Sequence, residues 1–143
     1  MRDTYFIIAG IAGFSPKLGT VGTAAWADYA VDYSLAHEID AREMPPEWPY
    51  GYFGIRTAGP ARKPQPHYRT EVYRLNAALV DQAYRLSRRV RLSDSAEARD
   101  YRSRFPSAPA NLPPRVTRCD TVSGDTWYAG EALGRRAEDW SPC

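Results

Sequence analysis

The chain has 143 residues, 25% of them charged and 43% hydrophobic, which is ordinary for a single globular domain. Its net charge of +2 comes from 19 basic and 17 acidic residues spread along the chain, so no nucleic-acid-binding face is expected. No stretch approaches the ~18 to 20 consecutive apolar residues of a membrane-spanning helix, and the start lacks the apolar region of a signal peptide. These features predict a soluble, cytoplasmic protein, or a periplasmic or secreted one if a leader is missing from the sequence.

Cysteine and histidine are too scarce to indicate a metal centre. The two cysteines are Cys119 and Cys143, and the two histidines are His37 and His67. We predict no metal site, no cofactor and no disulfide framework. Cys119 lies in a strand-like run, where we expect it to be a small buried side chain.

The first half of the chain is predicted to contain strands and a long loop. Residues 4–9 form an apolar run ended by glycine, which predicts a buried strand. Alternating polar and apolar residues over 26–35 predict a half-buried strand, and 36–41 are expected to continue it after a bend. Prolines and aromatics are dense over 44–69, and we expect an ordered, functional loop there that packs against something.

The second half is predicted to begin with a helix capped by Thr70. Six apolar residues at helical spacing would form one stripe on that helix: Val72, Leu75, Leu79, Ala83, Leu86 and Val90.

Three further elements complete the prediction. A shorter helix over 95–104 would be capped by Ser93 or Asp94. After a proline-rich stretch, residues 115–121 predict a strand, and a last helix starts near Ala129. Strands alternating with helices indicate an α/β sandwich, and because such a sheet needs more strands than these, both ends look incomplete.

A glycine-rich loop follows the first predicted strand. In Gly10-Ile11-Ala12-Gly13 the glycines lack a Cβ, so backbone N–H groups could approach a phosphate or a sugar. The loop is neither a P-loop nor a dinucleotide fingerprint, and a simple tight turn is the alternative interpretation.

A second candidate segment is the turn Ser123-Gly124-Asp125, followed by Trp127 and Tyr128. The two aromatic rings could stack on or wall a planar base. In the alternative interpretation Asp125 caps the next helix and Trp127 packs in the core. Both interpretations remain open from the residues alone.

A third segment concentrates charged groups ahead of an aromatic loop. The charges are His37, Glu38, Asp40, Arg42 and Glu43, and they could perform acid–base chemistry or simply form a surface ion-pair cluster. The loop behind them carries four aromatic residues: Trp48, Tyr50, Tyr52 and Phe53.

These segments, in this order and separation, resemble the purine nucleoside permeases. The resemblance covers nearly the whole chain and rests on residues 8–13, 33–43, 48–53, 70–76 and 119–127. That family is in turn similar to nucleoside phosphorylases and nucleosidases. The resemblance therefore implies one partial domain over 1–143, an α/β three-layer αβα sandwich with a central mixed sheet, incomplete at both ends.

The resemblance also implies roles for the three segments in binding a purine nucleoside. The loop Gly10, Ile11, Ala12, Gly13 would line the ribose and the phosphate or water side. Ser123, Gly124 and Asp125 would belong to the purine side, with Trp127 and Tyr128 as the wall. In dimeric relatives a loop reaches into the site of the neighbouring subunit, which implies a homodimer here. The residues of this chain that match that loop are His37, Asp40, Glu43, Trp48, Tyr50, Tyr52 and Phe53.

The departures from the family's enzymatic relatives determine the expected function. In those relatives a later acidic residue holds the ribose and a still later Asp protonates the leaving purine, and both would lie beyond Cys143. We therefore name no catalytic residue, Asp40, Asp120 and Asp125 included, and expect purine nucleoside binding or uptake. An N-glycosidic bond-cleaving enzyme, with phosphate or water as co-substrate, and a structural or storage relative stay open as alternatives.

Overall fold

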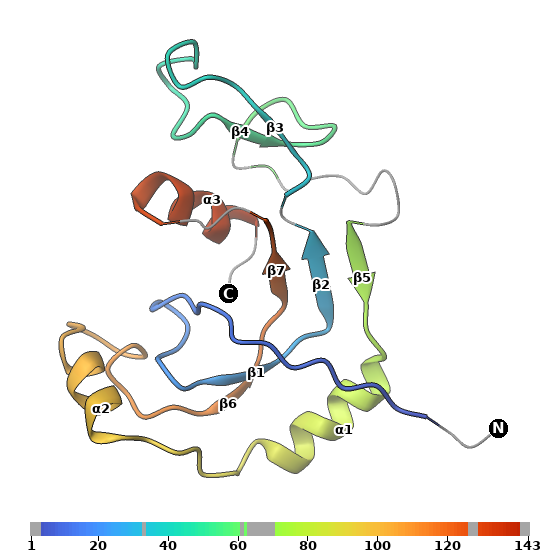
Figure 1. Ribbon diagram of the computed structural model, residues 1–143, viewed down its shortest axis with the longest axis vertical. Helices are drawn as coiled ribbons and strands as arrows, with labels where there is room; N and C mark the ends of the chain where they lie inside the picture. Colours follow the sequence, from blue (N-terminus) through green and yellow to red (C-terminus); the bar gives the residue numbers. More distant parts are fainter. Residues whose placement is uncertain (1–3, 33, 61, 63–70, 126–128, 141–143) are drawn as a thin grey trace.

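Figure 1 shows the computed structural model, which describes residues 4–32, 34–60, 62, 71–125 and 129–140. Within these ranges the chain forms small sheets and three helices, which confirms the α/β class. One sheet pairs β1 (Ala24–Trp26) with β6 (Val116–Arg118), a second has the order β5 (Val72–Arg74), β2 (Tyr29–Asp32), β7 (Thr121–Ser123), and a third pairs β3 (Ala36–Glu38) with β4 (Tyr52–Gly54).

The first two sheets form one bent ribbon, because β1 runs into β2 and β6 runs into β7, both pairs parallel. At the bend the Asp120 carboxylate accepts hydrogen bonds from the backbone N–H groups of Asp28 (3.0 Å) and Tyr29 (2.9 Å). The backbone N–H of Cys119 still donates to the carbonyl of Trp26 at 3.0 Å. A side chain thus replaces one rung of the ladder, and the strands predicted as continuous over 26–35 and 115–121 are each interrupted.

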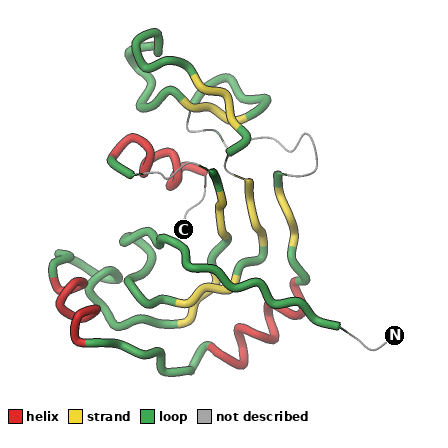
Figure 2. Tube along the Cα trace, in the orientation of Figure 1, coloured by secondary structure: helices red, strands yellow, loops and turns green. Residues whose placement is uncertain are grey.

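The apolar run over 4–9 is not a strand in the structure, and this prediction was wrong. Figure 2 shows the segment as a loop, and Phe6 and Ile8 are 90% and 93% exposed. No described strand lies against it, so its backbone has nothing to pair with. An apolar sequence records a preference for burial, but a strand also needs a partner edge.

Helix α1 (Ala77–Ser87) begins later than predicted. Asn76 is its N-cap, and the side chain accepts from the N–H groups of Ala78 (3.1 Å) and Leu79 (3.2 Å). The predicted cap, Thr70, lies outside the described residues. The first part of the predicted stripe is instead strand β5, antiparallel to β2.

The buried face of α1 also differs from the predicted stripe. Val80 is buried, and the indole N–H of Trp26 in β1 donates to the Ser87 hydroxyl at 2.9 Å. Leu79 and Leu86 of the predicted stripe are exposed, Leu86 to 76%. The contact of α1 with β1 and β6 determines which face of the helix is buried. A second apolar face of the same helix remains uncovered.

The remaining helices agree closely with the sequence. Helix α2 (Ala96–Ser103) is capped by Ser95, whose hydroxyl accepts from the N–H of Ala98, one residue away from the predicted start. Asp94 does not cap the helix; it forms a bidentate ion pair with buried Arg102, which lowers the pKa of Asp94. Helix α3 (Glu131–Trp140) follows Gly130, whose φ of 88° is a conformation that favours glycine.

Cys119 is not the small buried side chain that the sequence predicts. It is half-buried and disulfide-bonded. The other cysteine, Cys143, lies outside the described residues. Within the described ranges, none of the helices has the length and apolar character needed to cross a membrane.

Candidate functional site

The parallel strands β2 and β7 end side by side and bring polar side chains together (Figure 1). Their register places Asp32 opposite Ser123 at the carboxyl ends. Beyond the strands, the backbone N–H of Asp125 donates to the Ser34 hydroxyl at 2.9 Å, and the N–H of Ser34 donates to the Asp32 carboxylate at 2.8 Å. Ligands of α/β proteins commonly bind at this edge of a parallel sheet.

Only half of this cluster is visible in the sequence. The pattern predicts a site segment at Ser123, Gly124 and Asp125, whereas it places Asp32 and Ser34 on the polar side of a strand. Asp32 and Ser34 lie at the end of an alternating strand, which is the one feature of the sequence that could have indicated a site there. Only the pairing of β2 with β7 places them beside the 123–125 turn. Trp127 and Tyr128 lie outside the described residues, so their role as a purine wall stays a prediction.

The structure excludes one interpretation of Asp125. An N-cap lies directly before the first helical residue, and α3 begins only at Glu131. Asp125 instead uses its backbone N–H to fasten the turn to Ser34, and its side chain is exposed.

The glycine-rich loop, Gly10, Ile11, Ala12 and Gly13, is exposed throughout. A Cβ built on Gly10 or Gly13 would meet nothing within 4 Å, so packing does not require glycine at either position. In the ranges that the structure describes, no hydrogen bond occupies the backbone N–H groups of this loop. The role of this loop toward a phosphate or a sugar stays a prediction.

Helix α3 connects the segment after the glycine loop to the rest of the candidate site. The Lys17 ammonium donates to the Glu138 carboxylate at 2.6 Å, and the Ser15 hydroxyl donates to the same carboxylate at 3.4 Å. These two contacts tie residues 15 and 17, which follow the glycine-rich loop in the chain, to α3.

The aromatic loop also packs on α3. Tyr50 is 3% exposed, and its hydroxyl donates to the Asp139 carboxylate at 2.6 Å. The buried Arg136 guanidinium lies between two rings, 4.3 Å from the centre of Tyr52 and 4.5 Å from that of Trp140. The sequence offered no partner for this loop within the chain, and the structure supplies one; a role in a neighbouring subunit remains a prediction.

Further ring contacts stiffen the same hairpin. The Phe53 ring is 4.9 Å from His37 and 5.5 Å from Trp48, the latter in an edge-to-face arrangement. The N–H of Ile39 donates to the carbonyl of Gly51 at 2.8 Å, and a Cβ at Gly51 would lie only 2.4 Å from the Ile39 oxygen. The backbone approach at this point requires glycine.

The charged groups at the start of the loop form surface pairs. Asp40 is bound by Arg42 at 2.5 Å, and these hydrogen bonds lower the pKa of Asp40 to about 2. The Tyr52 hydroxyl donates to Glu38 at 2.9 Å, which raises the pKa of Tyr52. An Asp with so low a pKa is a poor general acid near neutral pH, so the ion-pair interpretation fits Asp40 best.

His37 and Glu43 are exposed, and the described residues contain no group of three side chains able to hold a metal ion.

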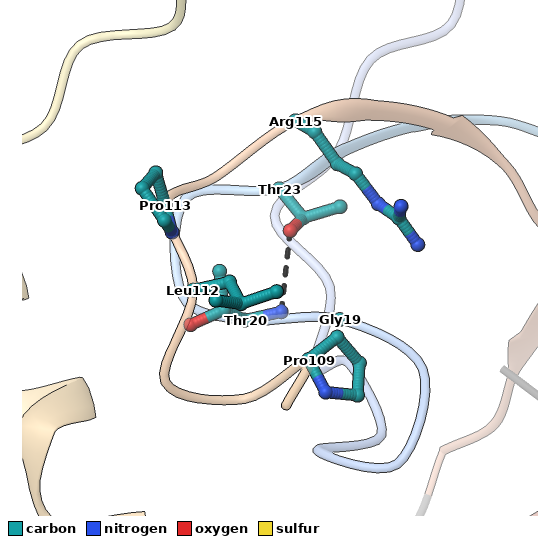
Figure 3. A pocket seen from close by; sticks show the side chains of 7 residues that line it. All are labelled: Gly19, Thr20, Thr23, Pro109, Leu112, Pro113 and Arg115. Atoms are coloured by element: carbon teal, nitrogen blue, oxygen red, sulfur yellow. Dashed lines mark hydrogen bonds between the residues drawn. The ribbon is translucent and has the colours of Figure 1, made fainter. Parts of the chain in front are cut away.

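A cavity of about 190 Å³ lies elsewhere, between the segment before β1 and the proline-rich segment before β6 (Figure 3). Its lining residues are Gly19, Thr20, Thr23, Pro109, Leu112, Pro113 and Arg115. The cavity lies at the amino ends of the parallel strands, and it is smaller than the ~300 Å³ lower bound of typical ligand pockets. The Thr20 hydroxyl closes one side by donating to the buried Ala110 carbonyl at 2.5 Å. We therefore do not count this cavity as a ligand pocket.

Comparison with known proteins places this geometry in context. A family model described as purine nucleoside permease (NUP) matches residues 1–143. The chain is 32% identical over 145 residues to a probable purine nucleoside permease of Schizosaccharomyces pombe, a match that covers 94% of this chain. It is 34% identical over 138 residues to the purine nucleoside permease of Candida albicans, a match that covers 93% of this chain.

The chain spans 41% of the length of the Schizosaccharomyces relative and 34% of that of the Candida relative. No solved structure matches it. The family model covers every residue of the chain, and both relatives carry the family's name. The chain therefore belongs to the purine nucleoside permease family.

Proposed function

We propose that this chain supplies a purine nucleoside-binding edge of an uptake or binding protein. The observation that carries the proposal is the family match over the whole chain, with relatives named purine nucleoside permease. The site is the carboxyl end of β2 and β7 together with the exposed glycine loop.

The chemistry of this edge suits a nucleoside. Ribose presents neighbouring hydroxyl groups, and carboxylate and hydroxyl oxygens such as those of Asp32, Ser34 and Ser123 are their natural hydrogen-bond partners. The unbonded N–H groups of Ala12 and Gly13, at the end of the loop over 10–13, would donate to the sugar, or to phosphate if it takes part. Trp127 and Tyr128 would provide the planar wall for the base.

The finer features of the fold belong to the same proposal. A three-layer αβα sandwich with one central mixed sheet would bring the bent β1–β2 and β6–β7 ribbon together with further strands. In that arrangement the β2–β7 edge opens toward the ligand, and α3 covers one side. A homodimer would add a neighbouring loop over 37–53 to the site.

Calorimetric titration with inosine and adenosine tests the proposal, with uridine as the pyrimidine control. It is performed on this chain and on this chain joined by a flexible linker to the part of the Candida albicans relative outside the match. Saturable binding of the purine nucleosides and weaker binding of uridine are expected. Failure of both proteins to bind any purine nucleoside would overturn the proposal and favour a structural role.

Site variants sharpen the test. Removing a hydrogen bond to a ligand hydroxyl by Ser123→Ala or Asp32→Asn should weaken binding about tenfold. Ser103→Ala and Asp100→Asn make the same chemical changes on the exposed face of α2 and should leave affinity unchanged. Equal effects of the site and control variants would contradict the assignment of this edge.

Base release, followed by chromatography with and without phosphate, separates binding from catalysis. Release of free purine by the linked protein would favour the bond-cleaving alternative. Phosphate dependence of that release would identify phosphorolysis rather than hydrolysis.

A further inference from the structure

The chain exposes far more surface than a folded protein of its size. A compact monomer of 16.1 kDa exposes about 7,400 Å². This chain exposes 10751 Å², an excess of roughly 3,300 Å² over the value from that scaling. Large hydrophobic interfaces between permanently associated polypeptides bury about 2,000–5,000 Å² in total, which is about 1,000–2,500 Å² on each partner. The excess on this chain is therefore larger than one partner's share of a permanent interface.

The most exposed apolar part is the segment over 5–11. Phe6, Ile8 and Ile11 are almost completely exposed, and Tyr5 and Ile7 are also mostly exposed. Successive side chains of an extended chain point to opposite faces, so both faces of this segment are apolar. That pattern is typical of a strand covered on both faces inside a larger sheet.

The backbone of this segment is equally without partners. In the described part of the chain, no hydrogen bond engages the N–H or C=O groups of residues 5–13. A segment whose backbone groups and apolar side chains are both uncovered can pair with the edge of a sheet in another polypeptide.

We propose that the segment over 5–11 docks as a β-strand against a complementary polypeptide with the family fold, the part that lies outside this match in the relatives. Well over half of each relative's length lies in that part, which is enough to cover an interface of this size. A second copy of this chain fits less well. Strand-to-strand pairing between two copies satisfies one edge and leaves both apolar faces in water.

Hydrogen exchange measured by mass spectrometry tests the docking. The two samples are this chain alone and this chain linked to the unmatched part of the Candida albicans relative. In the chain alone, amides 6–11 should exchange at the rate of unstructured peptide. In the linked protein their exchange should slow at least about a hundredfold.

Proline variants identify main-chain pairing. Ile7→Pro and Ile8→Pro each remove one N–H, and neighbouring N–H groups of a strand point to opposite edges. At least one variant should abolish the protection in the linked protein, and both should do so if the strand pairs at both edges. Ile8→Val keeps the N–H and an apolar side chain, and it should retain the protection. Neither proline should lower the thermal stability of the chain alone, because these N–H groups have no partner there.

Two results would overturn the proposal. One is unchanged fast exchange of amides 6–11 in the linked protein. The other is concentration-dependent protection in the chain alone, accompanied by a dimer in light scattering, which would assign the strand to a second copy. The readout does not involve nucleoside, so this test and that of the proposed function can fail separately.

Discussion

Arg136 offers a quantitative test of how the aromatic loop is held. Its side chain is almost fully buried between the rings of Tyr52 and Trp140, at 4.3 and 4.5 Å. A desolvated cation–π contact contributes about 2 kcal/mol, so two contacts total about 4 kcal/mol. Arg136→Met keeps a long side chain, and its sulfur–aromatic contacts restore about 1 kcal/mol each. The expected loss in the free energy of unfolding is therefore about 2 kcal/mol, a Tm decrease of about 4–8 °C.

A double-mutant cycle separates this interaction from general damage. Urea unfolding, followed by far-UV circular dichroism, is measured for Arg136→Met, Tyr52→Leu and the combination. Because the two side chains are in contact, the cycle should give a coupling energy of about 1 kcal/mol or more. Arg104→Met, at the exposed C-cap of α2, serves as the control and should cost less than about 0.5 kcal/mol. Additivity of the two substitutions to within ~0.3 kcal/mol would refute the reasoning.

Three further predictions address other contacts. Gly51→Ala forces a Cβ against the Ile39 carbonyl and should destabilise the hairpin by about 1–3 kcal/mol in urea unfolding; an unchanged midpoint would contradict the close approach. The lowered pKa of Asp40 means that its pairing stabilises above pH 3.8 and is lost as the pH falls through about 2, so a carboxyl NMR titration should report that midpoint and Arg42→Gln should move it toward 3.8. Thr20→Val removes a buried donor and should cost about 1–3 kcal/mol, whereas Thr20→Ser should cost less; equal costs would show that the hydroxyl is unimportant.

The helices could be predicted where their signals are local. Both α2 and α3 begin within about two residues of their predicted starts, because the start of a helix depends mostly on neighbouring residues. The cap of α2 is nevertheless Ser95, and not Ser93 or Asp94 as predicted. The start of α1 was missed because residues 72–74 carry a pattern compatible with both helix and strand. Residues 72–74 form a strand because they pair with β2, which lies more than forty residues earlier in the chain.

Elements that depend on distant partners could not be predicted. The apolar run over 4–9 has a strand sequence but no described strand beside it. The interruption of the two long strands depends on the Asp120 carboxylate reaching back to residues 28 and 29. No local pattern encodes such a contact, because an Asp that follows a strand occurs equally in turns where its carboxylate makes no long-range hydrogen bond.

The candidate site shows the same division. The segment 123–125 was predicted because a turn of small and acidic residues after a strand is visible in the sequence. Asp32 and Ser34 join it only through the parallel register of β2 and β7. The contacts of Tyr50 and Tyr52 with α3 were missed for the same reason, since the helix lies some ninety residues farther along the chain.

The bent ribbon has a consequence for how the chain acquires its structure during synthesis. Ala24 pairs with Val116 and Ala30 with Thr121, so each parallel pair closes a loop of about ninety residues. Such loops are closed late, because their entropy is lost before any pairing rewards it. On a ribosome that adds about 5–20 residues per second, β1 and β2 wait several seconds for β6 and β7 to emerge. During that interval β2 can pair only with β5 and β1 has no partner strand, so the nascent chain exposes strand edges that a chaperone would have to cover.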